Sequence, residues 1–219
     1  MQNQHTLEKI HNTFNKVTVV YGINTNCGKT YITQALINIK NIYFKENFAI
    51  KPIISGFNAT NYQNSDNYKL LQSCGYSNPS LNEVRSISAY ILNAALSPDI
   101  ASWDENISID FNIIMNFCRD WINKTKGNLF IETAGGVCSP CSNLHTMRSI
   151  SQELSNYKPY NVLVTTPYIG AISHTISALE MLKFDLLIIN KGDREFIKSI
   201  TNHLSYPIYM TSDEELCIK

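Results

Sequence analysis

The feature that most restricts the fold of this chain is a glycine-rich loop between a predicted strand and a predicted helix. Apolar, β-branched residues run through positions 17–21, and the loop Gly22-Ile23-Asn24-Thr25-Asn26-Cys27-Gly28-Lys29-Thr30 follows directly. Apolar residues then recur at helical spacing, at Ile32, Ala35, Leu36 and Ile39. Backbone N–H groups of such a loop, with the positive end of the helix, bind phosphate oxygens. The order of strand, loop and helix therefore predicts a nucleotide-binding α/β fold.

The polar groups of this loop have expected tasks. Lys29 reaches the terminal phosphates and is a candidate catalytic residue, and the Thr30 hydroxyl is a candidate Mg²⁺ ligand. Five residues separate Gly22 from Gly28, where the common motif has four. The nucleotide-binding residues expected here are Asn26, Cys27, Gly28, Lys29, Thr30 and Tyr31.

Three further polar segments follow predicted strands. They are Lys51-Pro52-Ile53-Ile54-Ser55-Gly56, Glu132-Thr133-Ala134-Gly135-Gly136 and Asn190-Lys191-Gly192-Asp193. In open α/β sheets, ligands bind at the carboxyl ends of the strands. We therefore expect these segments to gather beside the glycine-rich loop.

The longer loop and the segments that follow it in order resemble the dethiobiotin synthetase family from about residue 18 to residue 190. The resemblance implies that Thr25 binds substrate. Many members carry acidic residues where this chain has Asn24 and Asn26, so these positions add no negative charge here. An Asn amide can still hydrogen-bond a phosphate or a substrate amine.

The same resemblance implies roles for residues further along the chain. Lys51 would be catalytic, stabilising charge on a carbamate and on the transferring phosphoryl group, and Ser55 would contact substrate. Asp66 and Glu132 would join Thr30 as ligands of Mg²⁺, which takes few protein carboxylates. Thr133, Ala134 and Gly135 would contact nucleotide, as Asp66 and Glu132 would, and Gly136 would contact substrate.

The segment from Tyr168 to His174 is expected to begin a helix. In the family this region lies at a dimer interface, where the helix N-terminus of one subunit receives the substrate carboxylate of the other. A positive helix end suits a carboxylate. Ser173 is the candidate substrate contact, with helix capping as the alternative, and the resemblance implies a homodimer.

The identity of the nucleotide base stays open at this point. Asn190 matches the family's adenine-contacting Asn, and Lys191 is expected to contact the nucleotide as well. However, the chain continues to Asp193, which gives the Asn-Lys-x-Asp spelling also used by guanine-binding proteins.

Composition restricts the partners of the chain. Its 219 residues, 44% of them hydrophobic, can bury one sizeable core, so we expect a single domain over residues 1–219. Within it, residues 1–15 are expected as an N-terminal extension and 205–219 as a C-terminal tail. Eighteen basic residues balance eighteen acidic ones, which argues against binding to nucleic acid or an anionic membrane. No apolar run is long enough for a transmembrane helix, and we expect a cytoplasmic protein with small-molecule partners.

Alternating apolar runs and amphipathic stretches predict parallel strands joined by helices. The expected fold is a single-domain α/β fold of the P-loop NTPase type, a mostly parallel β-sheet with helices on both faces. Strands are expected at residues 17–21, 48–50, 129–132, 162–166 and 186–190, with a weaker one near Ile208-Tyr209. One helix should bury Phe111, Ile114, Met115, Cys118 and Ile122.

Two long loops, from residue 55 to about residue 66 and from 93 to 106, are expected to take part in binding, with disorder as the alternative. The six scattered cysteines are expected to be free thiols. Cys138-Ser139-Pro140-Cys141 has redox or metal spacing, but no second pair follows to complete a zinc site.

Together these features predict an ATP- and Mg²⁺-dependent dethiobiotin synthetase. The resemblance implies that 7,8-diaminononanoate and CO₂ form a carbamate, which ATP converts to a carbamic-phosphoric anhydride before the ureido ring closes. The alternative is a GTPase metallochaperone or switch protein, favoured by the Glu-x-x-Gly form of Glu132 to Gly135 and by Asp193. A partition-type ATPase is disfavoured because Ile23 stands where that group places a signature lysine.

Overall fold

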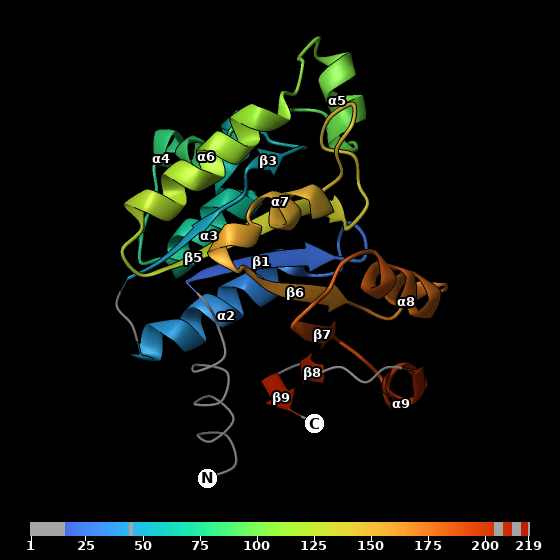
Figure 1. Ribbon diagram of the computed structural model, residues 1–219. Helices are drawn as coiled ribbons and strands as arrows, with labels where there is room; N and C mark the ends of the chain where they lie inside the picture. Colours follow the sequence, from blue (N-terminus) through green and yellow to red (C-terminus); the bar gives the residue numbers. More distant parts are fainter. Residues whose placement is uncertain (1–15, 44–45, 204–207, 212–215, 219) are drawn as a thin grey trace.

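The computed structural model describes residues 16–43, 46–203, 208–211 and 216–218. In this part of the chain, seven strands form one sheet in the order β2-β5-β1-β6-β7-β8-β9 (Figure 1). All neighbouring pairs are parallel except β8 and β9, which are antiparallel. The predicted α/β architecture with a mostly parallel sheet is confirmed.

The strands form where the sequence has short apolar, β-branched runs. Strands β1, β6 and β7 are buried along their whole length, as expected for parallel strands covered on both faces. Every expected strand is present, including the weaker one near Ile208. The sheet consists of β1 (Val17–Gly22), β2 (Asn47–Ile50), β5 (Asn128–Gly136), β6 (Tyr160–Thr165), β7 (Leu186–Asn190), β8 (Ile208–Thr211) and β9 (Leu216–Ile218).

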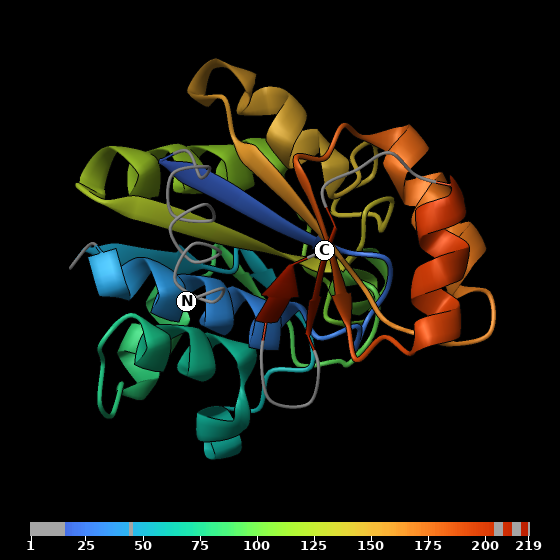
Figure 2. The ribbon, with the colours of Figure 1, turned by 90° about the horizontal axis from the view of Figure 1, so that it is seen from below.

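Helices cover both faces of this sheet. Figure 2 shows α2 (Lys29–Tyr43) on one face and α6 (Phe111–Lys124) with α7 (Arg148–Glu153) on the other. The expected apolar stripe of α6 is buried. The right-handed crossovers of parallel sheets produce this alternation. The remaining helical elements are α3 (Asp66–Ser73), α4 (Leu81–Ser86), α5 (Pro98–Asp104), η2 (Ser155–Tyr157), α8 (Ala171–Met181) and α9 (Arg194–His203).

The two segments expected as long loops contain short helices, which corrects that expectation. The first holds the 3₁₀ element η1 (Ala59–Asn64), where the Asn58 side chain accepts from Thr60 N, and α3 begins at Asp66. The second holds α5, which begins with Pro98 at a position where its missing N–H costs no helical hydrogen bond. The Asn58 cap and the Pro98 helix start are local features, but they stand in segments rich in Asn and Ser, a composition typical of loops.

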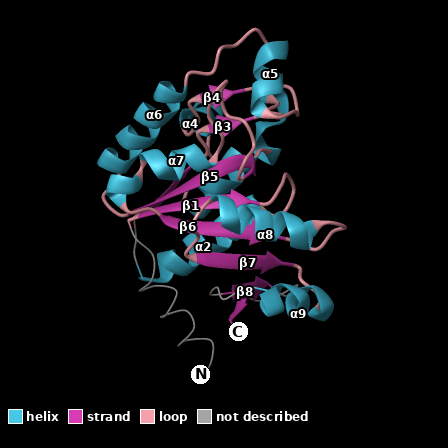
Figure 3. Ribbon diagram, turned by 45° about the vertical axis from the view of Figure 1, so that its right-hand side comes forward, coloured by secondary structure: helices cyan, strands magenta, loops and turns pink. Residues whose placement is uncertain are grey.

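The carboxyl ends of the parallel strands share one edge of the sheet, where α5 and α8 also lie (Figure 3). A small second sheet pairs β3 (Ile53–Ile54) with β4 (Tyr90–Ile91). The segment expected as a C-terminal tail contributes β8 and β9 to the main sheet, while residues 204–207 and 212–215 lie outside the described part. The expected extension at residues 1–15 also lies outside it.

Candidate functional site

The glycine-rich loop connects β1 to α2 at this carboxyl edge. Gly28 has a φ of +95°, a left-handed conformation that favours glycine. A Cβ atom at Gly28 would lie 2.1 Å from Asn190 Nδ2, so a side chain would also collide with β7. The Asn190 amide donates to the Cys27 carbonyl oxygen over 3.1 Å. The end of β7 thus fixes the loop just before the helix begins.

Lys29 extends from the first turn of α2 back across the loop. Its Nζ donates to the carbonyl oxygens of Asn24 and Gly135, each at 2.8 Å. The side chain is buried, and this burial lowers the pKa of Lys29 below its ordinary value. Lys29 therefore joins the loop to the end of β5, at the place where the sequence predicts the terminal phosphates.

Lys51 follows β2 and is fixed through its backbone. Its N–H donates to the Ile87 carbonyl over 3.0 Å, and the Ser88 hydroxyl donates to the Lys51 carbonyl over 2.5 Å. With its backbone held in this way, the buried Lys51 side chain extends toward α3 and β5. Its Nζ donates to Asp66 Oδ2 over 2.5 Å and to Glu132 Oε1 over 2.8 Å.

The electrostatics of this cluster favour charged groups. Burial disfavours the ammonium of Lys51, but Glu132 and Asp66 together raise its pKa above the ordinary value. Burial also disfavours the Asp66 carboxylate, and Lys51 more than offsets it, so the pKa of Asp66 is lowered. Lys51 is therefore a fixed cation and Asp66 a fixed anion at neutral pH.

The residues expected to bind Mg²⁺ lie together and fit that ion. The Thr30 hydroxyl donates to Glu132 Oε1 over 2.8 Å, which brings α2 and β5 together at this point. Glu132 Oε2 is buried and has no hydrogen-bond partner among the described residues. Mg²⁺ is usually held by one or two carboxylates together with phosphate oxygens. In the described ranges, no cluster of three or more His, Cys, Asp or Glu side chains forms a cage that would hold a metal without such phosphates.

An open cavity of about 880 Å³ lies over this cluster, and most of the predicted site residues line it. Phosphate-loop residues and Lys51 form one side, and Ala134 with Gly135 form another. Leu96, Ser97 and Pro98, from the segment that includes the start of α5, complete the wall. The predicted residues on its walls are Thr25, Asn26, Gly28, Lys29, Thr30, Tyr31, Lys51, Ser55, Asp66, Ala134 and Gly135.

Other predicted site residues support the wall from behind. Cys27 is fully buried, and the Thr133 hydroxyl donates to the Val20 carbonyl over 3.1 Å. Glu132 is likewise buried, and it accepts hydrogen bonds from Thr30 and Lys51, which line the cavity. A contact between nucleotide and Cys27 or Thr133 would therefore have to come from their backbone groups.

Asn190 and Asp193 both have structural roles at the end of β7. Asn190 is buried against the phosphate loop, and Lys191 follows it with a φ of +56°. The Asp193 carboxylate accepts from Phe196 N over 2.7 Å and so caps the first turn of α9. The guanine reading of Asn-Lys-x-Asp thus has a competing explanation in helix capping.

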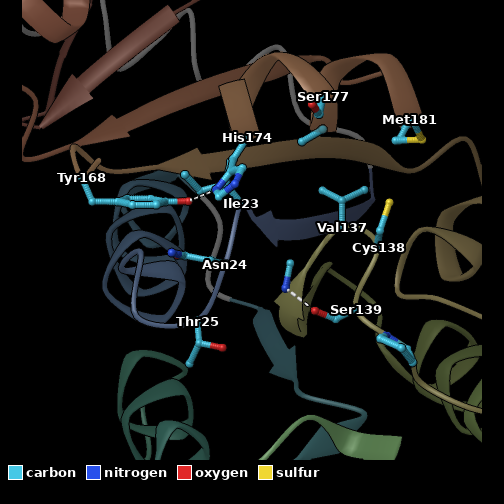
Figure 4. Close-up of a pocket in the computed structure, with 13 residues that line it drawn as sticks. Ile23, Asn24, Thr25, Val137, Cys138, Ser139, Tyr168, His174, Ser177 and Met181 are labelled. Carbon is cyan, nitrogen blue, oxygen red and sulfur yellow. Dashed lines mark hydrogen bonds between the residues drawn. The ribbon is translucent and has the colours of Figure 1, made fainter. Parts of the chain in front are cut away.

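A second cavity, of about 630 Å³, adjoins the first and shares Thr25 and Ser139 with it. It includes the predicted substrate residue Gly136 and runs between the segment after β5 and helix α8. Figure 4 shows its two walls, with His174, Ser177 and Met181 on α8 facing Val137, Cys138 and Ser139. Ser173 is exposed on α8, its hydroxyl donates to the Gly170 carbonyl, and it lies on the wall of neither cavity.

Ser139 is a site residue that sequence reasoning missed. Its hydroxyl accepts from Gly136 N over 2.7 Å, and with Thr25 it lines both cavities. A glycine pair followed three residues later by a serine is a turn signal that could have indicated it. The position of Ser139 between two cavities depends on long-range packing, which no local pattern carries.

Five cysteines are free thiols, as expected: Cys27, Cys74, Cys118, Cys138 and Cys141. Cys138 is exposed, whereas burial raises the pKa of the Cys141 thiol to about 12. Where the structure describes the chain, it contains no helix with the length and apolar character needed to cross a membrane.

Known proteins resemble this chain over most of its length. A family model described as an AAA domain matches residues 16–208. The chain is 32% identical over 175 residues to the ATP-dependent dethiobiotin synthetase BioD of Phenylobacterium zucineum, covering 78% of this chain and 71% of that protein. It is 29% identical over 203 residues to BioD of Chlamydia pneumoniae, covering 90% of this chain and 81% of that protein.

Solved structures share the fold at lower identity. The structure of FtsY from Mycoplasma mycoides aligns with a TM-score of 0.56 and 14% identity, covering 98% of this chain and 71% of that chain. At this identity the likeness shows a shared fold and nothing more. Because the match to the synthetases covers most of both chains and the AAA-domain model covers most of this one, the chain belongs to the dethiobiotin synthetase family of ATP-dependent ligases.

Proposed function

We propose that this protein is an ATP- and Mg²⁺-dependent dethiobiotin synthetase of biotin biosynthesis. It would form the ureido ring of dethiobiotin from 7,8-diaminononanoate and CO₂. The observation that carries this proposal is the position of Lys51, whose ammonium contacts Asp66 and Glu132 beside the phosphate loop. A fixed cation next to the phosphates suits a reaction that transfers a phosphoryl group onto an anionic carbamate.

The proposed reaction needs no protein nucleophile. One substrate amine attacks CO₂ and loses a proton, which gives a carbamate. A carbamate oxygen then takes the γ-phosphoryl group as its bond to the bridging oxygen of ADP breaks. The second amine attacks the carbonyl carbon of the carbamic-phosphoric anhydride, phosphate leaves, and the ring closes.

The residues of the chain would contribute position and charge to these steps. Lys29 would bind the terminal phosphate oxygens, and Lys51 would stabilise both the carbamate and the transferring phosphoryl group. Thr25, Ser55 and Gly136 would contact the substrate. Asn190 and Lys191 would lie against the nucleotide, and we propose adenine as its base.

Thr30, Asp66 and Glu132 would hold Mg²⁺, which would neutralise charge on the phosphate oxygens when bound. The carboxylate oxygen Glu132 Oε2 supports this assignment, because a buried acceptor without a partner is costly unless it binds something. Mg²⁺ could bind to Glu132 Oε2 while the Lys51 ammonium keeps its hydrogen bond to Glu132 Oε1.

We also propose that the protein is a cytoplasmic homodimer, in which Ser173 of one subunit lies near the substrate of the other. The exposed position of Ser173 in the single chain, outside both cavity walls, supports a contact made across an interface.

The purified protein tests this proposal in an assay that detects dethiobiotin by mass. The reaction contains 7,8-diaminononanoate, bicarbonate and Mg²⁺, with ATP and GTP in parallel. We expect dethiobiotin and phosphate in equal amounts with ATP, and no nucleotide hydrolysis above background without the diamine. Nucleotide hydrolysis that is independent of the diamine would instead support a GTPase or switch protein.

A further inference from the structure

The second cavity offers hydrogen-bonding groups but no carboxylate. Its polar side chains are an amide, hydroxyls, a thiol and an imidazole, and the rest of its wall is apolar. Neither Asp nor Glu occurs among the described residues that line it. The substrate proposed above carries two amines, and each becomes an ammonium when it takes up a proton. An ammonium that enters this cavity loses water without gaining an anionic partner, which is unfavourable.

Two cationic side chains lie beside this cavity. At the end next to the phosphate loop, Lys29 Nζ donates to the carbonyl oxygen of Asn24 over 2.8 Å. On the wall formed by α8, Arg148 Nη1 contacts Met181 Sδ at 3.5 Å. Positive charge near a site favours the uncharged form of an amine over its ammonium. The charges beside the cavity therefore act in the same direction as the loss of water.

The titratable groups on the cavity wall do not replace a carboxylate. They are Cys138, Tyr168 and His174, which supply a thiol, a phenol and an imidazole. The Tyr168 hydroxyl and His174 Nδ1 are hydrogen-bonded to each other over 2.6 Å. Burial raises the pKa of the Tyr168 hydroxyl, so it carries no negative charge at neutral pH. An amine in this cavity thus meets polar groups without a fixed anion.

Asn24 supplies an uncharged acceptor at the end of the cavity that adjoins the phosphate loop. Its backbone is held in place, because its carbonyl oxygen accepts from Lys29 and also from the Cys27 thiol, the latter over 3.4 Å. Its side-chain oxygen, Oδ1, is buried and has no hydrogen-bond partner among the described residues. The last torsion of an Asn side chain is soft, so Oδ1 can turn toward an N–H donor that enters the cavity. An amine of the substrate would satisfy this oxygen.

We propose that the second cavity binds one amine of the substrate in its uncharged form, with the Asn24 amide oxygen as the hydrogen-bond acceptor. An uncharged amine keeps the lone pair with which it attacks CO₂, so the form that the cavity selects is the form that reacts. This inference rests on the proposed function and concerns the amine end of the substrate. It leaves the proposed contact of the substrate with Ser173 of the partner subunit unchanged.

Selection of an uncharged amine has a consequence for pH. Two amines on neighbouring carbon atoms repel each other when both are charged, so one of them loses its proton at a much lower pH than the other. Below the lower of these two pKa values both amines are charged, and a site that takes one of them uncharged must release a proton. The affinity should then fall about tenfold for each pH unit, because the binding-competent form becomes rarer by that factor.

Calorimetric titration of the wild-type protein with 7,8-diaminononanoate tests this proposal by counting protons. The titration is repeated at pH 5.5 and pH 8 in buffers of different ionisation enthalpy. CO₂ is removed because it would convert an amine to a carbamate, and nucleotide is omitted because its phosphates bring charge of their own. We expect about one proton to be released for each diamine bound at pH 5.5. Binding at pH 5.5 without release of a proton would overturn the inference.

Three variants locate the effect. Asn24→Asp places an anion at the acceptor position, so it should bind the charged amine, release no proton at pH 5.5 and bind at least about tenfold more tightly than wild type there. Asn112→Asp adds the same charge at an exposed position on α6, away from both cavities, and should match the wild type. His174→Gln removes the imidazole that faces the same cavity, and the release of a proton should persist in it. Thermal unfolding checks that each variant is folded.

The outcomes separate this inference from the proposed function. If Asn24→Asp releases as many protons as the wild type, Asn24 does not face the amine and the inference is wrong. If the release disappears in His174→Gln, the proton comes from the imidazole and the inference is equally wrong. A wild type that forms dethiobiotin but binds the diamine without releasing a proton would overturn the inference alone. A wild type that releases the proton but forms no dethiobiotin would contradict the proposed function alone.

Discussion

Lys51 Nζ lies 2.8 Å from Glu132 Oε1, and both side chains are buried. The two residues are 81 positions apart in the sequence. Lys51 directly follows β2, and Glu132 lies in the middle of the neighbouring parallel strand β5. Because Glu132 Oε1 also accepts from Thr30, this one carboxylate connects the phosphate loop to the proposed catalytic lysine. The positions of Lys51 and of the loop are therefore coupled through a single side chain.

The first prediction concerns Lys51. We expect Lys51→Ala to reduce kcat by at least about 10²-fold, because the charge that stabilises the transferring group is lost. Nucleotide affinity, measured by calorimetry, should change little, since Lys29 and the loop backbone remain. Lys51→Met, which keeps the length of the side chain, distinguishes loss of charge from loss of packing, and the exposed Lys124→Ala is the control. Turnover of Lys51→Met at the wild-type rate would remove Lys51 from the mechanism.

The second prediction concerns the pH dependence of stability. The pKa of Asp66 in the folded protein is lowered, so the unfolded chain binds its proton at a higher pH than the folded protein does. The stability that Asp66 contributes is therefore present above the ordinary carboxyl range and is lost as pH falls through the folded pKa. Asp66→Asn should be less stable than wild type at pH 7, and the difference should shrink toward pH 3.

Urea unfolding at a series of pH values measures this difference. The exposed Asp120 on α6 provides the matched control, and Asp120→Asn should show no such pH-dependent gap. If the difference in free energy of unfolding between wild type and Asp66→Asn grows on acidification, the charged Asp66 does not stabilise the fold through Lys51.

The third prediction compares two glycines with nearly equal backbone angles. Gly28 and Gly75 have φ values of +95° and +96°, but only Gly28 has a neighbour, Asn190 Nδ2, in the place of a Cβ atom. Gly75→Ala should cost about 1 kcal/mol of stability through backbone strain alone. Gly28→Ala should weaken ATP binding in addition, because Asn190 and the loop must shift apart. Equal ATP affinity in the two variants, measured by calorimetry, would argue that Asn190 does not hold the loop in its binding conformation.

The fourth prediction addresses Asp193. Because its carboxylate caps α9 through Phe196 N, Asp193→Ala should lower stability by about 1 kcal/mol. The KM for ATP should stay within about twofold of wild type, since this carboxylate has no proposed contact with adenine. Asp193→Ser, which keeps a capping oxygen, should recover most of the stability. Loss of GTP use with retained stability would favour the guanine reading.

Much of the fold could be predicted because strand signals are local. The apolar runs that form β1, β6 and β7 are short, fully buried and bounded by turn residues, so the sequence marks each one without reference to its partners in the sheet. The order of the polar segments then places Lys29, Lys51 and Glu132 at one edge of the sheet, since parallel strands bring their carboxyl ends together.

The contribution of Ser139 could not be predicted in this way. Ser139 lines both cavities, and their other walls come from the phosphate loop and from α8, which are distant from it in sequence. The orientation of α8 likewise depends on packing of its buried residues, and it leaves Ser173 exposed while His174 faces the cavity. Helical spacing alone cannot say which face of an amphipathic helix meets a cavity.

The central claim, phosphorylation of a carbamate, is tested most directly by following an oxygen atom. The wild-type protein is supplied with ¹⁸O-labelled bicarbonate in rapid equilibrium with CO₂, together with 7,8-diaminononanoate, Mg²⁺ and ATP. If the γ-phosphoryl group passes to a carbamate oxygen, that oxygen leaves with phosphate at ring closure, so mass spectrometry should find one ¹⁸O in each released phosphate. Dethiobiotin formed with unlabelled phosphate would contradict this account.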